Sequence, residues 1–409
     1  MDPFLYELSH KFLRACKQTY RRYFIQKNRL KERLAILAGQ RGMGKTTLLT
    51  QYLLGHVQGD LFSPKILYVP ADHLSVESLS LYAIAEQFAQ NGGEYIAFDE
   101  IHKRDDWSLM LKSIYDSFPM LKIIASGSSA LEIHRGSHDL SRRAILYRVA
   151  GLSFREFLEM RFHLELPAIQ LNDMLENHPK YAYDLIAIIE KEEKILPLFQ
   201  EYLEHGFYPY WFEWNDIAKF QITLEQGIHV TLEADLLAIH PHLSGTSIKK
   251  IRALLTFIAE NAPYTPSWSQ LSSLLEVGDE RTLKNYFSLL EKADLISLLY
   301  KSSKKLSAMD TPAKIYLHNP NLCYTIARGK ENIGTVRETF LFNILSQSHT
   351  VTIPMNGDFL VDDHILLEVG GKNKNRKQIW TEQEAYVVAD DLEIGAGRKL
   401  PLWLFGFLY

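Results

Sequence analysis

Short apolar runs alternate with amphipathic stretches between residues 34 and 149. The runs are five or six residues long and lie at 34–38, 65–70, 94–98, 121–126 and 145–149. Apolar runs of this length, bounded by polar helical segments, are typical of strands buried on both faces of a sheet. Strands that alternate with helices predict a parallel sheet with crossover helices. This part of the chain is therefore predicted to be an α/β domain.

The pattern changes after the fifth run. Residues 154–240 are rich in Leu, Glu and Tyr and follow a helical period, broken by prolines and by His205-Gly206-Phe207-Tyr208-Pro209. Residues 247–318 predict a helix, a second helix at 267–275, a turn at 278–280, a third helix at 281–293, and strands at 296–300 and 314–317. This order is that of a winged helix-turn-helix.

A mixed α/β pattern ends the chain. We expect a helix at 335–346, followed by strands at 350–354, 358–361, 364–369, 384–389 and 401–405. The chain is thus predicted to have four parts: an α/β domain with an N-terminal helix (1–153), a helical connector (154–246), a winged helix (247–318) and a small α/β domain (319–409).

Composition and charge exclude several classes of protein. With 46% hydrophobic and 23% charged residues among 409, the chain is globular and long enough for two or three cores. Its 45 basic and 49 acidic residues give a net charge of −4, so nucleic-acid contact requires a local patch. Two cysteines exclude a disulfide framework, and no apolar stretch reaches the length of a membrane span. No signal peptide is visible, so we expect a cytoplasmic protein that does not bind membranes.

Residues 1–33 carry nine basic residues against three acidic ones. Apolar residues from Phe4 to Cys16 recur beside them at helical spacing. The pattern predicts an amphipathic helix that packs on the next domain and exposes a basic face to solvent.

The strongest chemical signal is a glycine-rich run after the first strand. It matches the pattern G-x-x-x-x-G-K-[ST] and opens a predicted helix at 46–54. The run consists of Gly39, Gln40, Arg41, Gly42, Met43, Gly44, Lys45, Thr46 and Thr47. Glycines let backbone N–H groups turn onto phosphate oxygens at a helix N-terminus. Lys45 is expected to neutralise the β- and γ-phosphates of ATP, and the Thr46 hydroxyl to ligate Mg²⁺.

Two carboxylates follow the third strand. Asp99 is predicted to hold Mg²⁺, and Glu100 to orient the attacking water as a catalytic residue. A carboxylate pair at a strand end is also a common helix N-cap, so the assignment depends on the phosphate loop.

Polar residues after the fourth strand are further candidates. Ser126 would lie beside the γ-phosphate and sense it, or else cap the helix that follows. Arg142 or Arg143 is either an arginine finger, in cis or from a second subunit, or part of a surface salt bridge. We take Arg143 as the catalytic candidate.

A second group of acids lies near the C-terminus. Asp358 and Glu368 are predicted on adjacent strands, where they would hold Mg²⁺, with Glu338 as a third ligand. Lys372 follows Glu368 by four residues, whereas a nuclease of the PD-(D/E)xK pattern has one residue between acid and lysine. Lys374 or Gln378 would be a substitute. The alternatives are an active nuclease, nucleic-acid contact without cleavage, and a structural role; the displaced Lys372 favours binding over cleavage.

The predicted winged helix leaves its partner open. Arg281, Lys284 and Asn285 are exposed on the second helix of the helix-turn-helix, a modest set for phosphate contacts, and winged helices also bind proteins. The aromatic cluster Tyr208, Tyr210, Trp211 and Trp214 is expected to be core rather than a base-stacking surface.

The motifs together resemble a known family. The runs Gly39–Thr47, Phe98–His102, Ser126–Ser129, Gly151–Phe157, His205–Pro209 and Val336–Phe340 resemble the AAA-like ATPases of bacteria and archaea whose C-terminal part is a domain of unknown function, DUF4143. The resemblance extends over nearly the whole chain. It implies a P-loop NTPase domain that binds ATP, a winged helix, and a C-terminal fold similar to PD-(D/E)xK nucleases.

Three functions are compatible with these predictions. The first is an ATP-hydrolysing switch or motor acting on DNA or a protein complex. The second is an ATP-gated DNA nuclease that uses the C-terminal acids. The third is a signalling scaffold whose assembly depends on its nucleotide state. Such an assembly could be a homo-oligomer.

Overall fold

All five apolar runs between residues 34 and 149 form strands of one parallel sheet. The computed structural model describes residues 3–127, 140–240, 243–301, 311–374 and 384–409. The sheet has the order β2-β3-β4-β1-β5. Its strands are β1 (Leu34–Ala38), β2 (Ile66–Pro70), β3 (Tyr95–Asp99), β4 (Lys122–Gly127) and β5 (Ile145–Arg148). Each strand begins and ends within one residue of its predicted position.

Helices lie on both sides of this sheet. Helix α3 (Lys45–His56) contacts β2, β3 and β4, whereas α5 (Leu81–Gln90) and α6 (Trp107–Ser117) pack on alternate strand residues such as Ile36, Ile96 and Ile123. The described part of this unit also contains the short helices α2 (Tyr23–Lys27), α4 (Leu74–Glu77) and η1 (Ile101–Lys103). Because all five strands are parallel, the carboxyl ends of β1, β3 and β4 meet at one edge, where the phosphate loop also begins.

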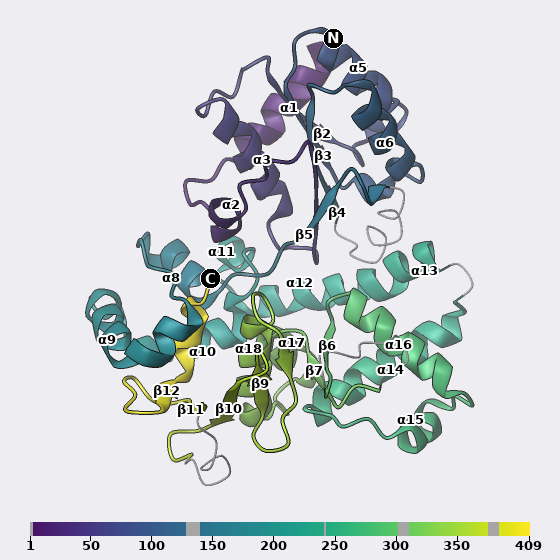
Figure 1. Cartoon of the computed structure of the whole chain (residues 1–409). Helices are drawn as coiled ribbons and strands as arrows, with labels where there is room; N and C mark the ends of the chain where they lie inside the picture. The colour runs from purple at the N-terminus through teal and green to yellow at the C-terminus, as the bar shows by residue number, and fades with distance from the viewer. Residues whose placement is uncertain (1–2, 128–139, 241–242, 302–310, 375–383) are drawn as a thin grey trace. The chain divides into compact units, whose positions relative to one another are not determined.

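The basic N-terminal segment is only partly as predicted. Helix α1 (Pro3–Ala15) is amphipathic, buries Leu5, Leu8 and Leu13, and packs against the edge strand β2 (Figure 1). The expected solvated basic face does not extend to Arg22, which is 5% exposed. Its guanidinium group is buried because backbone carbonyl oxygens accept its hydrogen bonds.

Residues 154–240 are helical, as predicted. The elements are α8 (Phe154–Phe162), α9 (Leu171–Ile189), α10 (Ile195–Glu201), α11 (Trp211–Trp214), α12 (Ile217–Val230) and α13 (Leu236–Ile239), with π-helical turns η3 (Tyr202–Gly206) and η4 (Thr231–Asp235). Ser153 caps α8 in a complete capping box with Glu156, which explains why this helix begins at Phe154.

Three helices and a strand pair follow, in the predicted order. They are α14 (Gly245–Asn261), α15 (Trp268–Leu275), α16 (Glu280–Lys292) and the antiparallel strands β6 (Ile296–Leu299) and β7 (Lys314–Leu317). Leu271, Leu283, Phe287 and Leu290 are buried between the helices. Asp279 caps α16 by accepting the Arg281 N–H, so the turn predicted at 278–280 has a local physical cause.

The C-terminal strands form a mixed sheet of order β12-β11-β10-β9-β8. These strands are β8 (Val351–Thr352), β9 (Phe359–Val361), β10 (Ile365–Gly370), β11 (Ala385–Ala389) and β12 (Lys399–Pro401). Helices α17 (Pro320–Ala327) and α18 (Ile333–Leu345) precede them, and the 3-10 helix η6 (Leu402–Phe407) follows. The predicted strand 401–405 is therefore wrong. Only Pro401 belongs to a strand, and the buried run after it packs against α8 and α18 as a 3-10 helix.

The chain divides into two units, Met1–Ala150 and Gly151–Tyr409. The first ends close to the predicted boundary at residue 153. Contacts join the remaining residues into one unit, so the division of that unit into three domains stays a prediction. Among the described residues, no helix is both long enough and apolar enough to span a bilayer.

Candidate functional site

The glycine-rich run forms the loop between β1 and α3. Gly42 and Gly44 have φ values of 82° and 78°, a left-handed backbone that glycine adopts without strain. A Cβ atom on Gly39 would lie 2.7 Å from the carbonyl oxygen of Val149, so this position also needs glycine. Lys45 is 5% exposed, and its Nζ donates to the carbonyl oxygens of Gly39 and Gln40, each at 2.8 Å. The loop thus holds a buried ammonium group among its own carbonyls.

Asp99 lies at the carboxyl end of β3 and is 4% exposed. Thr46 Oγ1 donates to its Oδ2 at 2.6 Å, and the Tyr68 hydroxyl donates to the same oxygen. Ser126 Oγ and the Glu100 N–H both donate to Oδ1. The structure therefore brings together three residues predicted from the sequence, Thr46, Asp99 and Ser126. Hydroxyl and carboxylate oxygens are hard donors of the kind that Mg²⁺ prefers, so Thr46 and Asp99 fit the predicted ion.

Glu100 follows in a left-handed conformation, with a φ of 50°. Its N–H is fixed by Asp99 Oδ1 and lies 3.3 Å from Ser126 Oγ. Its Oε2 is 3.6 Å from Nδ1 of His102. Burial lowers the pKa of His102 to about 3, and Lys103, Arg41 and Lys45 add to that effect. The imidazole beside Glu100 is therefore neutral at physiological pH.

Tyr68 and His102 also lie at this site, but the sequence motifs did not predict a role for either of them. His102 gave a weak signal, as the last residue of the run Phe98–His102. Tyr68 gave none, since a tyrosine in an apolar strand is ordinarily core. Ser128, Ser129 and the loop 136–139 lie outside the described residues.

Arg143 has a partner in its own chain. Its Nε and Nη2 donate to the two carboxylate oxygens of Asp116 at 2.8 and 2.9 Å. The hydrogen bonds between these two side chains raise the pKa of Arg143 and lower the pKa of Asp116. This is the salt-bridge alternative; Arg142, beside it, is exposed.

We expect Arg143→Ala and Asp116→Ala to keep ATPase rates within about twofold of the wild type, because solvent-exposed ion pairs of this kind contribute little to the stability of a protein. Steady-state phosphate release over a range of protein concentrations checks this. Selective slowing of Arg143→Ala, rescued by mixing with Lys45→Ala protein, would instead support a finger supplied by a second subunit.

Arg22 connects the phosphate loop to the end of the first unit. Its Nη1 donates to the carbonyl oxygen of Met43 at 3.0 Å, and both Nη1 and Nη2 donate to that of Ala150 at 3.1 Å. Ala150 is the last residue of this unit. A buried cation therefore links Met43 of the loop to the residue where the chain passes into the second unit.

The C-terminal acids are compensated by lysines. Lys314 Nζ lies 3.6 Å from Glu338 Oε2 and 3.9 Å from Asp358 Oδ1, and Asp358 Oδ2 also accepts the Val369 N–H at 2.8 Å. Burial, followed by the charge of Asp358, raises the pKa of Glu338. Within the described ranges, no three His, Cys, Asp or Glu side chains gather as a metal-binding group. Glu338 therefore lies near Asp358, but with Glu368 these acids do not form a metal-binding group in the described part of the chain.

Lys374 occupies the space beside Glu368 where the nuclease pattern would place a lysine at position 370. A Cβ atom on Gly370, two residues after Glu368, would lie 2.7 Å from Cβ and Cγ of Lys374. The stem of Lys374 therefore runs where a side chain at position 370 would lie, and its Nζ reaches Glu368 Oε1 at 2.5 Å. Lys372, in contrast, is exposed. Of the two substitutes named from the sequence, Lys374 lies at the acid and Gln378 is outside the described residues.

We expect Lys374→Ala to lower the free energy of unfolding by about 1–3 kcal/mol, because it leaves Glu368, 2% exposed, as a buried charge without its cation. Adding Glu368→Gln should recover most of the loss, and Lys372→Ala is the matched control. Urea unfolding followed by tryptophan emission measures it, since five of the six tryptophans follow residue 150. Unchanged stability in Lys374→Ala would contradict a structural ion pair.

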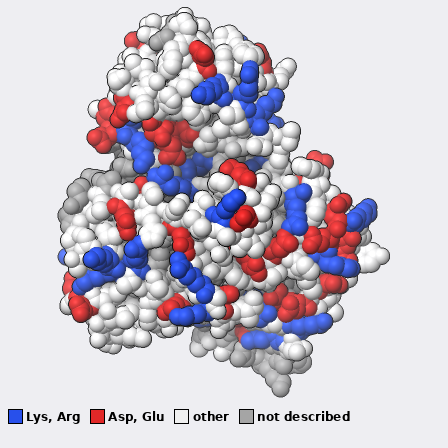
Figure 2. Space-filling view, turned by 180° about the vertical axis from the view of Figure 1, so that it is seen from behind, with Lys and Arg blue, Asp and Glu red and all other residues white. Residues whose placement is uncertain are grey.

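The helix α16 offers few free charges. Lys284 pairs with Glu280 at 3.0 Å and lies 5.5 Å from the ring centroid of Trp268, whereas Arg281 and Asn285 are exposed. On the face seen in Figure 2, Lys and Arg side chains are interspersed with Asp and Glu. Neither observation provides the local basic patch that DNA binding requires.

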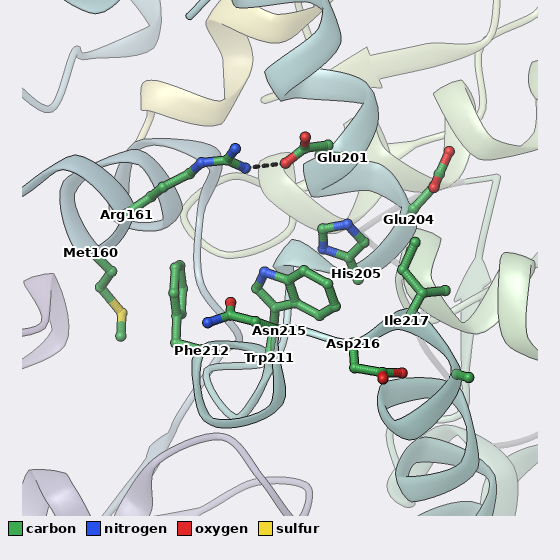
Figure 3. Close-up of a pocket in the computed structure, with 11 residues that line it drawn as sticks. Met160, Arg161, Glu201, Glu204, His205, Trp211, Phe212, Asn215, Asp216 and Ile217 are labelled. Atoms are coloured by element: carbon green, nitrogen blue, oxygen red, sulfur yellow. Dashed lines mark hydrogen bonds and ion pairs between the residues drawn. The ribbon is translucent and has the colours of Figure 1, made fainter. Parts of the chain in front are cut away.

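A pocket of about 810 Å³ lies within the second unit, between residues of α8, η3, α11 and α12. Figure 3 shows Arg161 directed at Glu201 and the ring of His205 beside Trp211. These two rings stack with centroids 3.6 Å apart. Burial, and then the charge of Arg161, lowers the pKa of His205 to about 4, so this ring is neutral at physiological pH. Tyr208 is core as predicted, but Trp211 lines a pocket and Trp214 is 46% exposed, so the expectation was wrong for these two tryptophans.

Comparison with known families assigns the first unit. The model of the AAA domain family matches residues 31–158, the segment that holds the parallel sheet, the phosphate loop and Asp99. The N-terminal unit has the P-loop NTPase fold and matches the AAA domain family over these residues. A second model, that of a domain of unknown function (DUF8612), matches residues 196–332. The expected family DUF4143 is thus not the one found for this region.

Individual relatives are distant. An uncharacterized protein of Methanocaldococcus jannaschii is 27% identical over 416 residues, with 90% of this chain and 82% of that protein covered. A Walker-type ATPase of Pyrococcus abyssi covers 74% of this chain and 93% of its own, at 16% identity and a TM-score of 0.41. DnaA of Aquifex aeolicus, bound to AMPPCP, covers 66% and 87% at 14% identity and a TM-score of 0.24.

Proposed function

We propose that the AAA domain binds ATP with Mg²⁺ at residues 39–47 and hydrolyses it. The observation that carries the proposal is the 2.6 Å hydrogen bond from Thr46 to Asp99, next to the buried ammonium of Lys45. It joins the first turn of α3 to the end of β3, so the two halves of a phosphate and cation site are already in contact.

Each residue then has a role. Backbone N–H groups of the loop and the Lys45 ammonium would contact the phosphates, and Thr46 and Asp99 would hold Mg²⁺, which supplies positive charge to the phosphate oxygens. Glu100 would orient the attacking water and accept its proton. Ser126, hydrogen-bonded to Asp99, would respond to the occupancy of the site.

Arg22 gives this ATPase a route to act as a switch. Met43 lies in the loop that would close on phosphate, and Ala150 lies at the boundary of the second unit; Arg22 bonds to both. A shift of the loop with nucleotide state would change these hydrogen bonds and so alter the backbone at residue 150. The second unit would carry the output as a winged helix and a nuclease-like domain.

The target is DNA or a protein complex. The lysine partners of Asp358 and Glu368, and the mixture of basic and acidic side chains on the surface, favour a protein target over an ATP-gated nuclease. A protein target corresponds to the scaffold hypothesis. Incubation of the full chain with labelled plasmid and linear DNA, with and without ATP and Mg²⁺, separates these functions. Cleavage that is lost in Asp358→Ala would establish the nuclease, and DNA retention without cleavage would establish DNA as the target.

A further inference from the structure

We propose that Tyr68 is a positioning residue that orients Asp99 for the divalent cation, and that through Tyr68 helix α1 becomes part of the nucleotide site. The inference rests on the proposed ATPase function. It adds an element of the site that lies outside both motifs of the sequence.

The position of β3 in the sheet explains why two hydroxyl groups hold Asp99. Strand β3 lies between β2 and β4, and Asp99 is its last residue. Ser126, on β4, donates to Oδ1, and Tyr68, on β2, donates to Oδ2 at 2.5 Å. One hydroxyl from each neighbouring strand therefore fixes one oxygen of the carboxylate. Thr46, the remaining side-chain donor, is itself a proposed ligand of the cation.

Tyr68 can supply only orientation at this site. Its side chain is 2% exposed, and it contributes a neutral donor rather than a charge. Groups that hydrogen-bond to metal-ligating carboxylates fix their direction, and their removal typically weakens metal binding about 10–100-fold. Phenylalanine would fill nearly the same volume without the donor, so the substitution isolates this single hydrogen bond.

Helix α1 in turn holds Tyr68 in place. The Tyr68 N–H donates to Ser9 Oγ at 2.9 Å, and Ser9 is 1% exposed. Because β2 is an edge strand, this N–H has no strand partner on that side, and Ser9 satisfies it. The Tyr68 ring stacks on Phe12 with centroids 5.4 Å apart and planes 22° from parallel. Helix α1 thus fixes both the backbone and the ring of the residue that orients Asp99.

The test is the Mg²⁺ dependence of ATP binding by the full chain. A fluorescent ATP analogue is titrated in EDTA and at increasing Mg²⁺ for the wild type, Tyr68→Phe and Ser9→Ala. Tyr82→Phe is the matched control, because its hydroxyl donates to Ser117 Oγ instead. We expect Tyr68→Phe to need about tenfold more Mg²⁺ for half of the full effect, with unchanged affinity in EDTA. Ser9→Ala should shift the same midpoint in the same direction by a smaller factor.

Two results would overturn the inference and remain distinct. If the wild type responds to Mg²⁺ and Tyr68→Phe follows the same curve, Tyr68 does not orient the cation ligand, whatever its effect on stability. If the wild type binds no ATP and Lys45→Ala behaves identically, the proposed ATPase function fails and the inference fails with it.

Discussion

Lys45→Ala protein is expected to bind ATP at least about a hundredfold more weakly than the wild type. The ammonium group of Lys45 lies inside the loop, 2.8 Å from each of two loop carbonyl oxygens. Among the residues of Gly39–Thr46, Lys45 is the one basic residue that is buried. A hydrogen bond to a charged group contributes about 1.5–3 kcal/mol, so the loss of two such bonds, to the β- and γ-phosphates, removes about 3 kcal/mol or more and lowers the affinity more than about a hundredfold. Isothermal titration calorimetry with ATP and Mg²⁺ measures the difference directly.

Lys65→Ala is the matched control for this variant. Lys65 lies in the same unit, forms an ion pair with Glu94 at 2.7 Å, and its side chain is 56% exposed. Its removal changes the net charge equally but leaves the loop intact, so ATP affinity should stay within about twofold of the wild type. Equal affinity in the wild type and Lys45→Ala would contradict a phosphate-binding role for the loop.

The second large effect is expected for Glu100→Gln, which should keep ATP affinity within about twofold and slow hydrolysis about a hundredfold or more. Glutamine retains the shape of the side chain but cannot accept the proton of the attacking water. The backbone N–H of Glu100 is fixed by Asp99. His102 cannot replace Glu100 as the base that accepts the proton, because its pKa is lowered to about 3. Phosphate release under single-turnover conditions measures the chemical step without product release.

Glu94→Gln provides the control, because the Glu94 side chain is 45% exposed and pairs with Lys65 in the same unit. A wild-type rate in Glu100→Gln would show that Glu100 does not orient the water. Loss of ATP binding in the same variant would mean that the roles of Asp99 and Glu100 are assigned wrongly.

Local sequence pattern was sufficient to predict the strands and the phosphate loop of the first unit. Strands buried on both faces give continuous apolar runs, and the phosphate loop and carboxylate pair follow two of them directly, so β1, β3 and the residues after them were predictable from contiguous sequence. The same logic failed at 401–405. A short apolar run does not distinguish a strand from a buried 3-10 helix, and close packing of Gly406 on Phe154 of α8 decides between them.

Contacts between distant segments were not predictable in this way. The hydrogen bond from Tyr68 to Asp99 spans 31 residues, and Arg22 reaches Ala150 across 128. Tyr68 has the sequence signal of a core aromatic residue, and Arg22 that of a solvated basic face. Lys374 was recognisable only as one of two substitutes, because its approach to Glu368 depends on the space above Gly370.

Release of labelled phosphate from γ-labelled ATP by the full chain tests most directly whether the N-terminal domain hydrolyses ATP. We predict that the wild type releases phosphate with Mg²⁺ and not in EDTA, and that Lys45→Ala, assayed at the same ATP concentration, releases none above background. Phosphate release by the wild type no greater than that of Lys45→Ala, at saturating ATP and Mg²⁺, would contradict the claim.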